Sequence, residues 1–377
     1  MRPMRAAEQV LVQEFLAAFQ AATDSELIGQ REEVPFDERQ RLDALLRVRL
    51  PNQVDAVDLA VEAVDATYPR DAHRLAEFLT YFNDRRRQDA APAVPVVATR
   101  HLTSAAKDVL RDAGINYFES SSGTLLFRYR TWLIDIERPS KQSLDRKIGS
   151  LFNGAREQVV HALLMHWYRT GEQGWVAGNE LATTAETSTF TVSKTLQELE
   201  KHDWVEATGS GPSQRRRLKN AGGLLDAWSD EWTRRARSEP RTRLYTYAGG
   251  RGGIVDRILQ KMDGRTGWAI SGAAAANARV PHLTVVDRVL VIVPPGLAKP
   301  WAEEMGLERA DKGSNITFVE RSGASLQFLD EHPERPDSRF TSPFIQYLDL
   351  LDGVGRNKEL AREYRERVLK LGEPDHD

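Results

Sequence analysis

The chain has 377 residues, a formal net charge of −3 at neutral pH, 41% hydrophobic residues and 28% charged residues. This length predicts two or three domains, and the composition is typical of a soluble globular protein. The absence of cysteine excludes disulfides, thiolate metal ligands and cysteine nucleophiles. The charge balance carries no overall signature of nucleic-acid binding, so any such activity has to come from local patches.

Neither a membrane span nor a signal peptide is predicted. No apolar run approaches the roughly 18 residues that a membrane helix needs. The first residues carry charge, but no hydrophobic segment follows them. We therefore expect a cytoplasmic protein.

The first 140 residues mix signals for helices and strands. Apolar spacing predicts helices over 6–22 and 39–50, with a charged loop between them at 30–39. Alternating residues predict a strand over 54–64, and Pro69 opens the next helix. The later elements are a strand at 95–98, a helix at 104–113, and strands at 117–119, 125–129 and 132–136. We therefore expect a mixed α/β domain over 1–150 that ends in a polar connector at 139–154.

The strand–helix–strand order of this region resembles PD-(D/E)xK endonucleases. Those enzymes bring two acids and a lysine to a divalent metal and its water. Asp55 and Glu62 have a tolerable separation, but Val64 occupies the position of the lysine, and no lysine follows Asp135 and Glu137 at the right spacing. We expect structural carboxylates in a degenerate endonuclease-like domain, with no catalytic residue, metal or cofactor. The alternative is a metal-dependent nuclease that uses Asp55, Glu62, Asp135 or Glu137.

The elements expected over 151–239 have the order of a winged helix-turn-helix. Apolar spacing from Val159 to Trp167 predicts a first helix, and a short second helix is expected over 178–184. Thr187 and Ser188 offer N-caps for a third helix that runs to about Lys201. A strand at 204–208, a Gly-Pro turn and the basic strand 214–219 would then form the wing.

The third helix has one apolar stripe and one polar side. Val192, Leu196 and Leu199 recur at i, i+4 and i+7, as expected of a side that faces a core. The opposite side is expected to face the major groove of DNA, while the cations of the wing contact phosphates or the minor groove. The predicted DNA-binding residues are Ser188, Thr189, Phe190, Thr191, Ser193, Lys194 and Gln197 in the helix, and Arg215, Arg216, Arg217 and Lys219 in the wing. Gln197 is a candidate for reading adenine, and Lys194 for reading guanine or holding a phosphate.

The remaining residues, 240–377, predict a C-terminal α+β domain. Before this domain, still within 151–239, a helix containing Trp228 and Trp232 is expected to lead out of the wing and to pack back on it. The glycines at 249–253 are expected to form a flexible turn because they lack the Gly-Lys-[Ser/Thr] ending of a P-loop. Strands are expected at 268–270, 285–293 and 316–320, a loop at 331–341, and closing helices at 342–351 and 357–369.

Three stretches together resemble the AbiEi antitoxins of type IV toxin–antitoxin systems. They are the wing with its exit helix (215–228), the segment Gly267-Trp-Ala-Ile-Ser-Gly-Ala-Ala-Ala275, and Ser342-Pro-Phe-Ile-Gln-Tyr-Leu-Asp-Leu-Leu351 with the closing helix. The resemblance implies a winged-helix autorepressor that binds inverted repeats in double-stranded promoter DNA, with a C-terminal domain that assists DNA binding or antitoxicity. It also implies functional pairing with a nucleotidyltransferase-like toxin without a stable complex, no membrane partner, and possible homo-oligomers on DNA. A regulator of a phage-defence locus is the related possibility.

Overall fold

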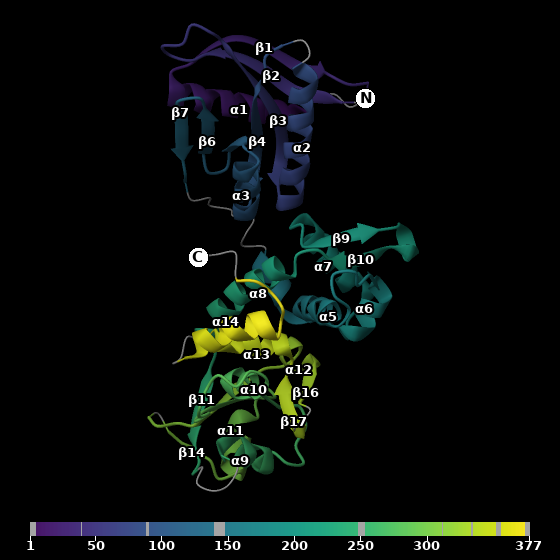
Figure 1. Ribbon diagram of the computed structural model, residues 1–377, viewed down its shortest axis with the longest axis vertical. Coiled ribbons are helices and arrows are strands. Elements are labelled where there is room, and N and C mark those ends of the chain that lie inside the picture. The colour runs from purple at the N-terminus through teal and green to yellow at the C-terminus, as the bar shows by residue number, and fades with distance from the viewer. Residues whose placement is uncertain are drawn as a thin grey trace. The chain divides into compact units, whose positions relative to one another are not determined.

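Figure 1 shows the computed structural model, which describes residues 5–38, 40–87, 90–138, 148–247, 253–310, 312–332, 335–351 and 356–373. The chain divides into two compact units, Met1–Ile148 with Glu200–Asp203, and Gly149–Leu199 with Trp204–Asp377. Three sheets occur among the described residues, so the protein is a multidomain chain of mixed α and β structure, as predicted. Most of the expected connector at 139–154 and of the glycine-rich turn at 249–253 lies outside the described residues. None of the described helices is long and apolar enough to cross a membrane.

The first unit is built on a sheet whose seven strands follow the order of the chain. Strands β3, β4 and β5 are parallel, and the other neighbouring pairs are antiparallel. The parallel strands are connected by α2 (Pro69–Arg86) and α3 (Ser104–Asp112). The strands are β1 (Glu26–Pro35), β2 (Arg41–Arg49), β3 (Val57–Thr67), β4 (Val94–Leu102), β5 (Asn116–Glu119), β6 (Thr124–Tyr129) and β7 (Trp132–Ile136).

Both faces of this sheet are covered by helices. Helix α1 (Ala6–Thr23) buries Phe15 and Phe19 against one face, together with Val61 of β3. Helices α2 and α3 pack on the other face, where Leu79 and Leu110 contact a second apolar cluster. The unit therefore has three layers and contains both α and β structure.

Two predictions for this unit are wrong. The segment expected to be a charged loop at 30–39 is largely strand β1, and the helix expected over 39–50 is strand β2. In β2, Leu42 and Leu45 belong to the cluster under α2, whereas Leu46 belongs to the cluster under α1. A strand buried on both faces does not alternate between apolar and polar residues, so its leucines also fitted a helical spacing.

The second unit begins with three helices and a small sheet. Helix α5 (Gly154–Thr170) is followed by β8 (Val176–Ala177), α6 (Gly178–Thr184) and α7 (Thr189–Lys201). Strands β9 (Val205–Thr208) and β10 (Arg215–Leu218) then form an antiparallel hairpin, and β8 pairs with the other edge of β10. The observed helices and strands of this region match the predicted order.

Helix α8 (Ala221–Ala236) leads from the hairpin to a second seven-stranded sheet of mixed direction. The spatial order of its strands is β14 (Glu308–Arg309), β11 (Arg241–Tyr245), β15 (Ile316–Glu320), β13 (Val289–Val293), β12 (Ala269–Ser271), β17 (Arg335–Thr341) and β16 (Leu329–His332). Figure 1 labels the helices of this region, which are α9 (Gly253–Lys261), α10 (Gly272–Arg279), α11 (Ala298–Glu304), α12 (Ala324–Gln327), α13 (Pro343–Leu350) and α14 (Asn357–Arg367).

The structure corrects two expectations here. The loop predicted at 331–341 is largely formed by β16 and β17, and the strand expected over 285–293 is only Val289–Val293. Helix α14 carries many charged residues, yet not all of them are exposed. Arg365 is 3% exposed and forms a two-pronged ion pair with Asp226 of α8, with N–O distances of 2.6 and 3.2 Å.

Candidate nucleic-acid interface

Helix α7 is fixed by a cap and by its apolar stripe. The hydroxyl of Ser188 accepts a hydrogen bond from the backbone N–H of Thr191 at 3.1 Å, which satisfies one of the free donors of the first turn. Val192, Leu196 and Leu199 are each at most 1% exposed. The predicted inner side of the helix is therefore buried, and its polar side faces away from that core.

The outer side of α7 presents a short polar surface with one aromatic ring. Phe190 is 71% exposed, and the ammonium of Lys194 lies 5.9 Å from its ring centroid. Of the other predicted residues, Ser188, Thr189, Lys194 and Gln197 are exposed, and Thr191 and Ser193 are half-buried at the flanks. The exposed phenylalanine and the lysine beside it give this side of α7 a mixed aromatic and cationic surface.

The hairpin after α7 separates the predicted cations by strand alternation. Arg215 pairs with Thr208 and Leu218 with Val205, so Arg216 and Leu218 point to the inner side of β10. Arg216 is only 8% exposed, whereas Arg215 and Lys219 are exposed. The structure thus places Arg215 and Lys219 at the surface, and Arg216 cannot make the outward contact expected of it.

Arg217 is held in place by three neighbours. It forms an ion pair with Glu206 of β9, donates a hydrogen bond to the side chain of Gln173 at 2.8 Å, and lies 4.9 Å from the ring centroid of Trp175. These contacts fix the guanidinium between β9 and the segment before β8. Gln173, Trp175 and Glu206 were not found from the sequence, because only their position next to β10 gives them this role.

Helix α5 is anchored to the rest of its unit by buried polar contacts. Glu157 of α5 accepts hydrogen bonds from the indole N–H of Trp228 at 2.9 Å and from Arg235 at 2.6 Å. His161 of α5 is fully buried; its Nδ1 lies 2.9 Å from the carbonyl of Ala324, and its Nε2 lies 2.7 Å from Oγ of Ser342. Burial lowers the pKa of His161 to about 3, so the ring is neutral, with Nδ1 donating and Nε2 accepting.

The carboxylates considered for a nuclease do not converge. Glu62 lies on β3 and Asp135 on β7, four strands apart in the sheet, which corresponds to about 19 Å. Asp55 precedes β3, and Glu137 follows β7. Among the described residues, no group of three or more His, Asp or Glu side chains is arranged to hold a metal ion.

Glu62 instead forms a close pair with Asp43 of the neighbouring strand β2. The backbone N–H of Asp43 donates to Oε1 of Glu62 at 3.1 Å, and the N–H of Ala63 donates to Oδ2 of Asp43 at 2.8 Å. Burial, and then the charge of Asp43, raise the pKa of Glu62 to about 9. Burial also raises the pKa of Asp43. At neutral pH the pair therefore holds a proton.

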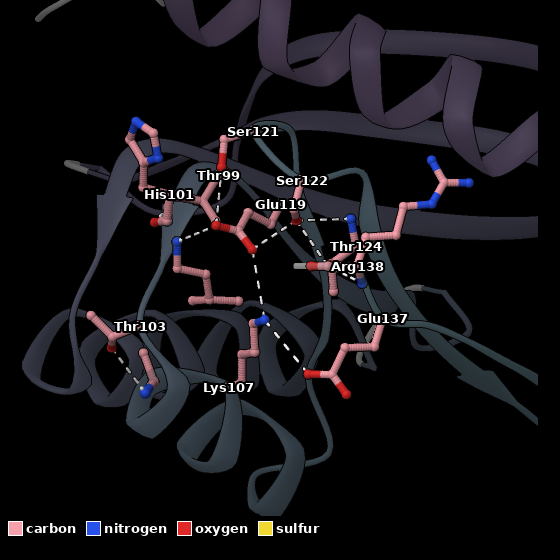
Figure 2. Close-up of polar contacts among 12 residues, drawn as sticks. Thr99, His101, Thr103, Lys107, Glu119, Ser121, Ser122, Thr124, Glu137 and Arg138 are labelled. Carbon is pink, nitrogen blue, oxygen red and sulfur yellow. Dashed lines mark hydrogen bonds and ion pairs between the residues drawn. The ribbon is translucent and has the colours of Figure 1, made fainter. Parts of the chain in front are cut away.

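Figure 2 shows a second polar cluster of the first unit, around the buried carboxylate of Glu119. Its oxygens accept hydrogen bonds from the N–H of Leu102 and from the hydroxyls of Ser121 and Ser122, at 2.9 to 3.2 Å. The ammonium of Lys107 in α3 lies 3.7 Å from Glu119 and 3.9 Å from Glu137. Three hydrogen bonds and the nearby ammonium hold this carboxylate in place, so the cluster fixes the turn after β5.

The chain matches no protein-family model and no curated protein sequence. The functional inference is therefore carried by the geometry of the described residues. The exposed side of α7, followed directly by the β9–β10 hairpin, is the candidate interface. Trp204 joins the two parts, since its N–H donates to the carbonyl of Leu199 and its carbonyl accepts from the N–H of Lys219, at 3.2 and 2.7 Å.

Proposed function

We propose that this chain is a sequence-specific, DNA-binding transcriptional regulator in which residues 154–219 form a winged helix-turn-helix. The observation that carries the proposal is the outer side of α7, where Phe190, Lys194 and Gln197 are exposed next to a hairpin that presents Arg215 and Lys219. The order α5, β8, α6, α7, β9, β10, with β10 between β8 and β9, supports it. A helix of 13 residues is about 20 Å long, which suits insertion into a major groove about 12 Å wide.

The proposed contacts with DNA are of two kinds: contacts with base edges and contacts with the phosphate backbone. In this proposal Gln197 reads adenine, and Lys194 reads guanine or holds a phosphate. Ser188, Thr189, Thr191 and Ser193 complete the surface of the helix that faces the groove. Arg215 and Lys219 bind phosphates, while Arg217 acts from a fixed position beside Trp175.

We further propose that the protein is an antitoxin-like autorepressor that binds inverted repeats at its own promoter. The AbiEi resemblance supports this reading through the three stretches in the second unit. It includes functional pairing with a nucleotidyltransferase-like toxin without a stable complex, and possible homo-oligomers on DNA. The intracellular role of a regulator also makes a cytoplasmic location part of this proposal.

The test is binding of the full chain to labelled duplex DNA from the region upstream of its own gene, measured by fluorescence anisotropy at several salt concentrations. The double variant Arg215→Ala/Lys219→Ala should bind every duplex more weakly, and the slope of log K against log[salt] should become shallower by about 2. Gln197→Ala should instead lose about 1–3 kcal/mol on the operator alone.

Arg362→Ala is the matched control, because Arg362 is a 75% exposed arginine of α14 that pairs only with the exposed Glu373 among the described residues. It should leave both the affinity and the salt slope unchanged. Full affinity and an unchanged slope in the Arg215→Ala/Lys219→Ala variant would refute the wing. Absence of any preference for the upstream duplex over random DNA would refute the regulator.

For the first unit we propose a degenerate endonuclease-like domain that does not cut DNA. Two observations support this proposal. Asp43 and Glu62 form a pair of carboxyl groups on adjacent strands, and Val64 occupies the position where a catalytic lysine would follow Glu62. Incubation of the full chain with plasmid DNA and Mg²⁺ or Mn²⁺ should leave the plasmid intact. Cleavage that disappears in Glu62→Ala would replace this proposal with the metal-dependent nuclease.

A further inference from the structure

A basic cavity lies in the second unit on the side of β11 that faces away from the apolar core. Its volume is about 750 Å³, within the range of about 300–1,000 Å³ that is usual for small-molecule sites. Arg241 and Arg243 are exposed at alternate positions of β11, whereas Leu244 points into the core beneath α9 and α11. A neighbouring cavity of about 730 Å³ shares Arg241 and Arg243 with it, so the two cavities lie side by side.

Five cationic side chains from four elements surround the cavity. They are Arg237 at the end of α8, Arg241 and Arg243 of β11, Arg309 of β14 and Lys358 of α14. All five are exposed, and none of them forms an ion pair or a side-chain hydrogen bond with another described residue. Unpaired like charges held together repel one another, so this arrangement is relieved by a bound anion.

The two acids of the cavity wall do not neutralise these cations. Both carboxylate oxygens of Glu239 bind Arg321, at 2.6 and 2.7 Å. Asp349 binds Arg321 through Oδ1 at 2.8 Å and accepts a hydrogen bond from Ser271 through Oδ2 at 2.5 Å. The nearly buried Arg321 offsets one of these two negative charges, and the five exposed cations outweigh the other, so the cavity keeps a positive field.

The chemistry of the wall selects linked phosphates. Guanidinium groups present paired N–H donors that match phosphate oxygens, and four of the five cations are arginines. Trp232 is only 3% exposed, and the guanidinium groups of Arg235 and Arg321 lie 5.0 and 4.6 Å from its ring centroid. This ring therefore supplies no open stacking surface inside the cavity, so the phosphates and not an aromatic base are the recognised feature.

We propose that this hollow is a binding site for a small ligand that carries two or more linked phosphate groups. Such a ligand spans cations that come from separate walls of a concave site. A nucleic-acid duplex presents its phosphates on a convex surface, which suits the protruding α7 and hairpin rather than a hollow enclosed by α8, β11, α13 and α14. The site is distinct from the proposed DNA interface and does not depend on it.

The experiment is isothermal titration calorimetry of the full chain with inorganic tripolyphosphate and, separately, with a nucleoside triphosphate, in 150 mM NaCl. Saturable binding with one site per chain is expected, and the double variant Arg241→Ala/Arg243→Ala should weaken it at least tenfold. Similar affinity for both probes would assign the recognition to the phosphates, whereas clearly tighter binding of the nucleoside triphosphate would add a contact with the nucleoside. Both results support the site.

Arg257→Ala is the matched control, because Arg257 is an exposed arginine of α9, on the opposite side of the sheet. It should bind both probes as the wild type does, and circular dichroism should show all variants folded. Three results would overturn the proposal: no saturable binding of either probe, equal affinity in the Arg241→Ala/Arg243→Ala variant, or an oligothymidylate that binds this site at least tenfold more tightly than tripolyphosphate. Loss of DNA binding with retained tripolyphosphate binding would refute the proposed regulator alone.

Discussion

The proton held between Asp43 and Glu62 makes the first unit sensitive to pH in a direction that one substitution can test. Glu62→Gln replaces a carboxyl group that is neutral in the folded state with an amide of the same shape. The amide N–H₂ can donate to Asp43 as the carboxyl proton does, and its oxygen can still accept from the N–H of Asp43. The variant therefore keeps the contacts and removes the titration.

The size of the effect follows from the pKa. Glu62 has an ordinary pKa of 4.5 in the unfolded chain and a pKa of about 9 in the folded one. Because the folded pKa is raised, stability is highest below pH 4.5 and falls as the pH rises towards 9. At pH 7 this costs about 3 kcal/mol relative to a group that does not titrate, and at pH 5 less than about 1 kcal/mol.

The assay is calorimetric unfolding of the full chain and of the Glu62→Gln variant at pH 5 and pH 7. The variant should melt about 10 °C above the wild type at pH 7 and close to it at pH 5. Hydrogen–deuterium exchange of peptides from β2 and β3 assigns the transition to this sheet. Glu77→Gln, at an exposed glutamate of α2, is the matched control and should melt as the wild type does at both pH values. A difference between Glu62→Gln and wild type that is the same at pH 5 and pH 7 would show that Glu62 is not held neutral.

Three further substitutions test buried contacts of the second unit. Because burial lowers the pKa of His161 to about 3, the contribution of the neutral ring to stability is complete above pH 6.5 and is lost as the pH falls. The free energy of unfolding should drop by about 2 kcal/mol between pH 7 and pH 5. His161→Gln should lack this drop in urea titrations. An unchanged pH dependence in His161→Gln would contradict the neutral ring. Arg321→Leu removes the cation that pairs with the buried Asp349 and the half-buried Glu239 and should cost about 3–5 kcal/mol in the same titrations, so a loss below about 1 kcal/mol would argue against a stabilising role of these ion pairs. Arg365→Lys cannot reproduce the two-pronged contact with Asp226 and should cost at least about 1 kcal/mol; equal stability would mean that the fork geometry is not needed.

The parts of the fold that the sequence predicts are those with local signals. Helix α7 combines a capping serine with a clean stripe of Val192, Leu196 and Leu199, and the predicted end at Lys201 is the observed end. Its outer surface is also the predicted one. These features depend on residues within one or two helical turns, so no long-range contact is needed to place them.

The elements that were missed depend on contacts from distant parts of the chain. Strand β2 is covered on both faces, so its leucines carry no alternation. Strand β17 contains Pro336, which favoured the prediction of a loop. The strand pairs with β12 at Phe340, away from this proline. Neither the second sheet face nor the pairing partner can be read from the local residues.

The candidate site also combines features that the local sequence can predict with features that depend on distant parts of the chain. The run of three arginines, Arg215 to Arg217, was interpreted as one outward-facing patch. The alternation of side chains along a strand would have separated Arg216, which is 8% exposed, from Arg215. The hollow beside β11 could not be predicted, because Arg237, Arg309 and Lys358 come from three other elements. Its cations meet only after the second sheet has formed.

The overall charge of −3 conceals both surfaces because acids and cations are distributed differently. Several acids of the second unit, among them Glu157, Asp226, Glu239 and Asp349, are held in ion pairs with arginines. Screening by salt acts on exposed charges over about 8–10 Å and reaches buried pairs far less. Raising NaCl from 50 to 500 mM should therefore lower the DNA affinity at least about 50-fold through the contacts of Arg215 and Lys219 alone, while the calorimetric melting temperature changes by only a few degrees. If the melting temperature fell as steeply with salt as the DNA affinity, the ion pairs of these acids would be screened as strongly as the exposed cations. The explanation of the two basic surfaces by buried acids and exposed cations would then be wrong.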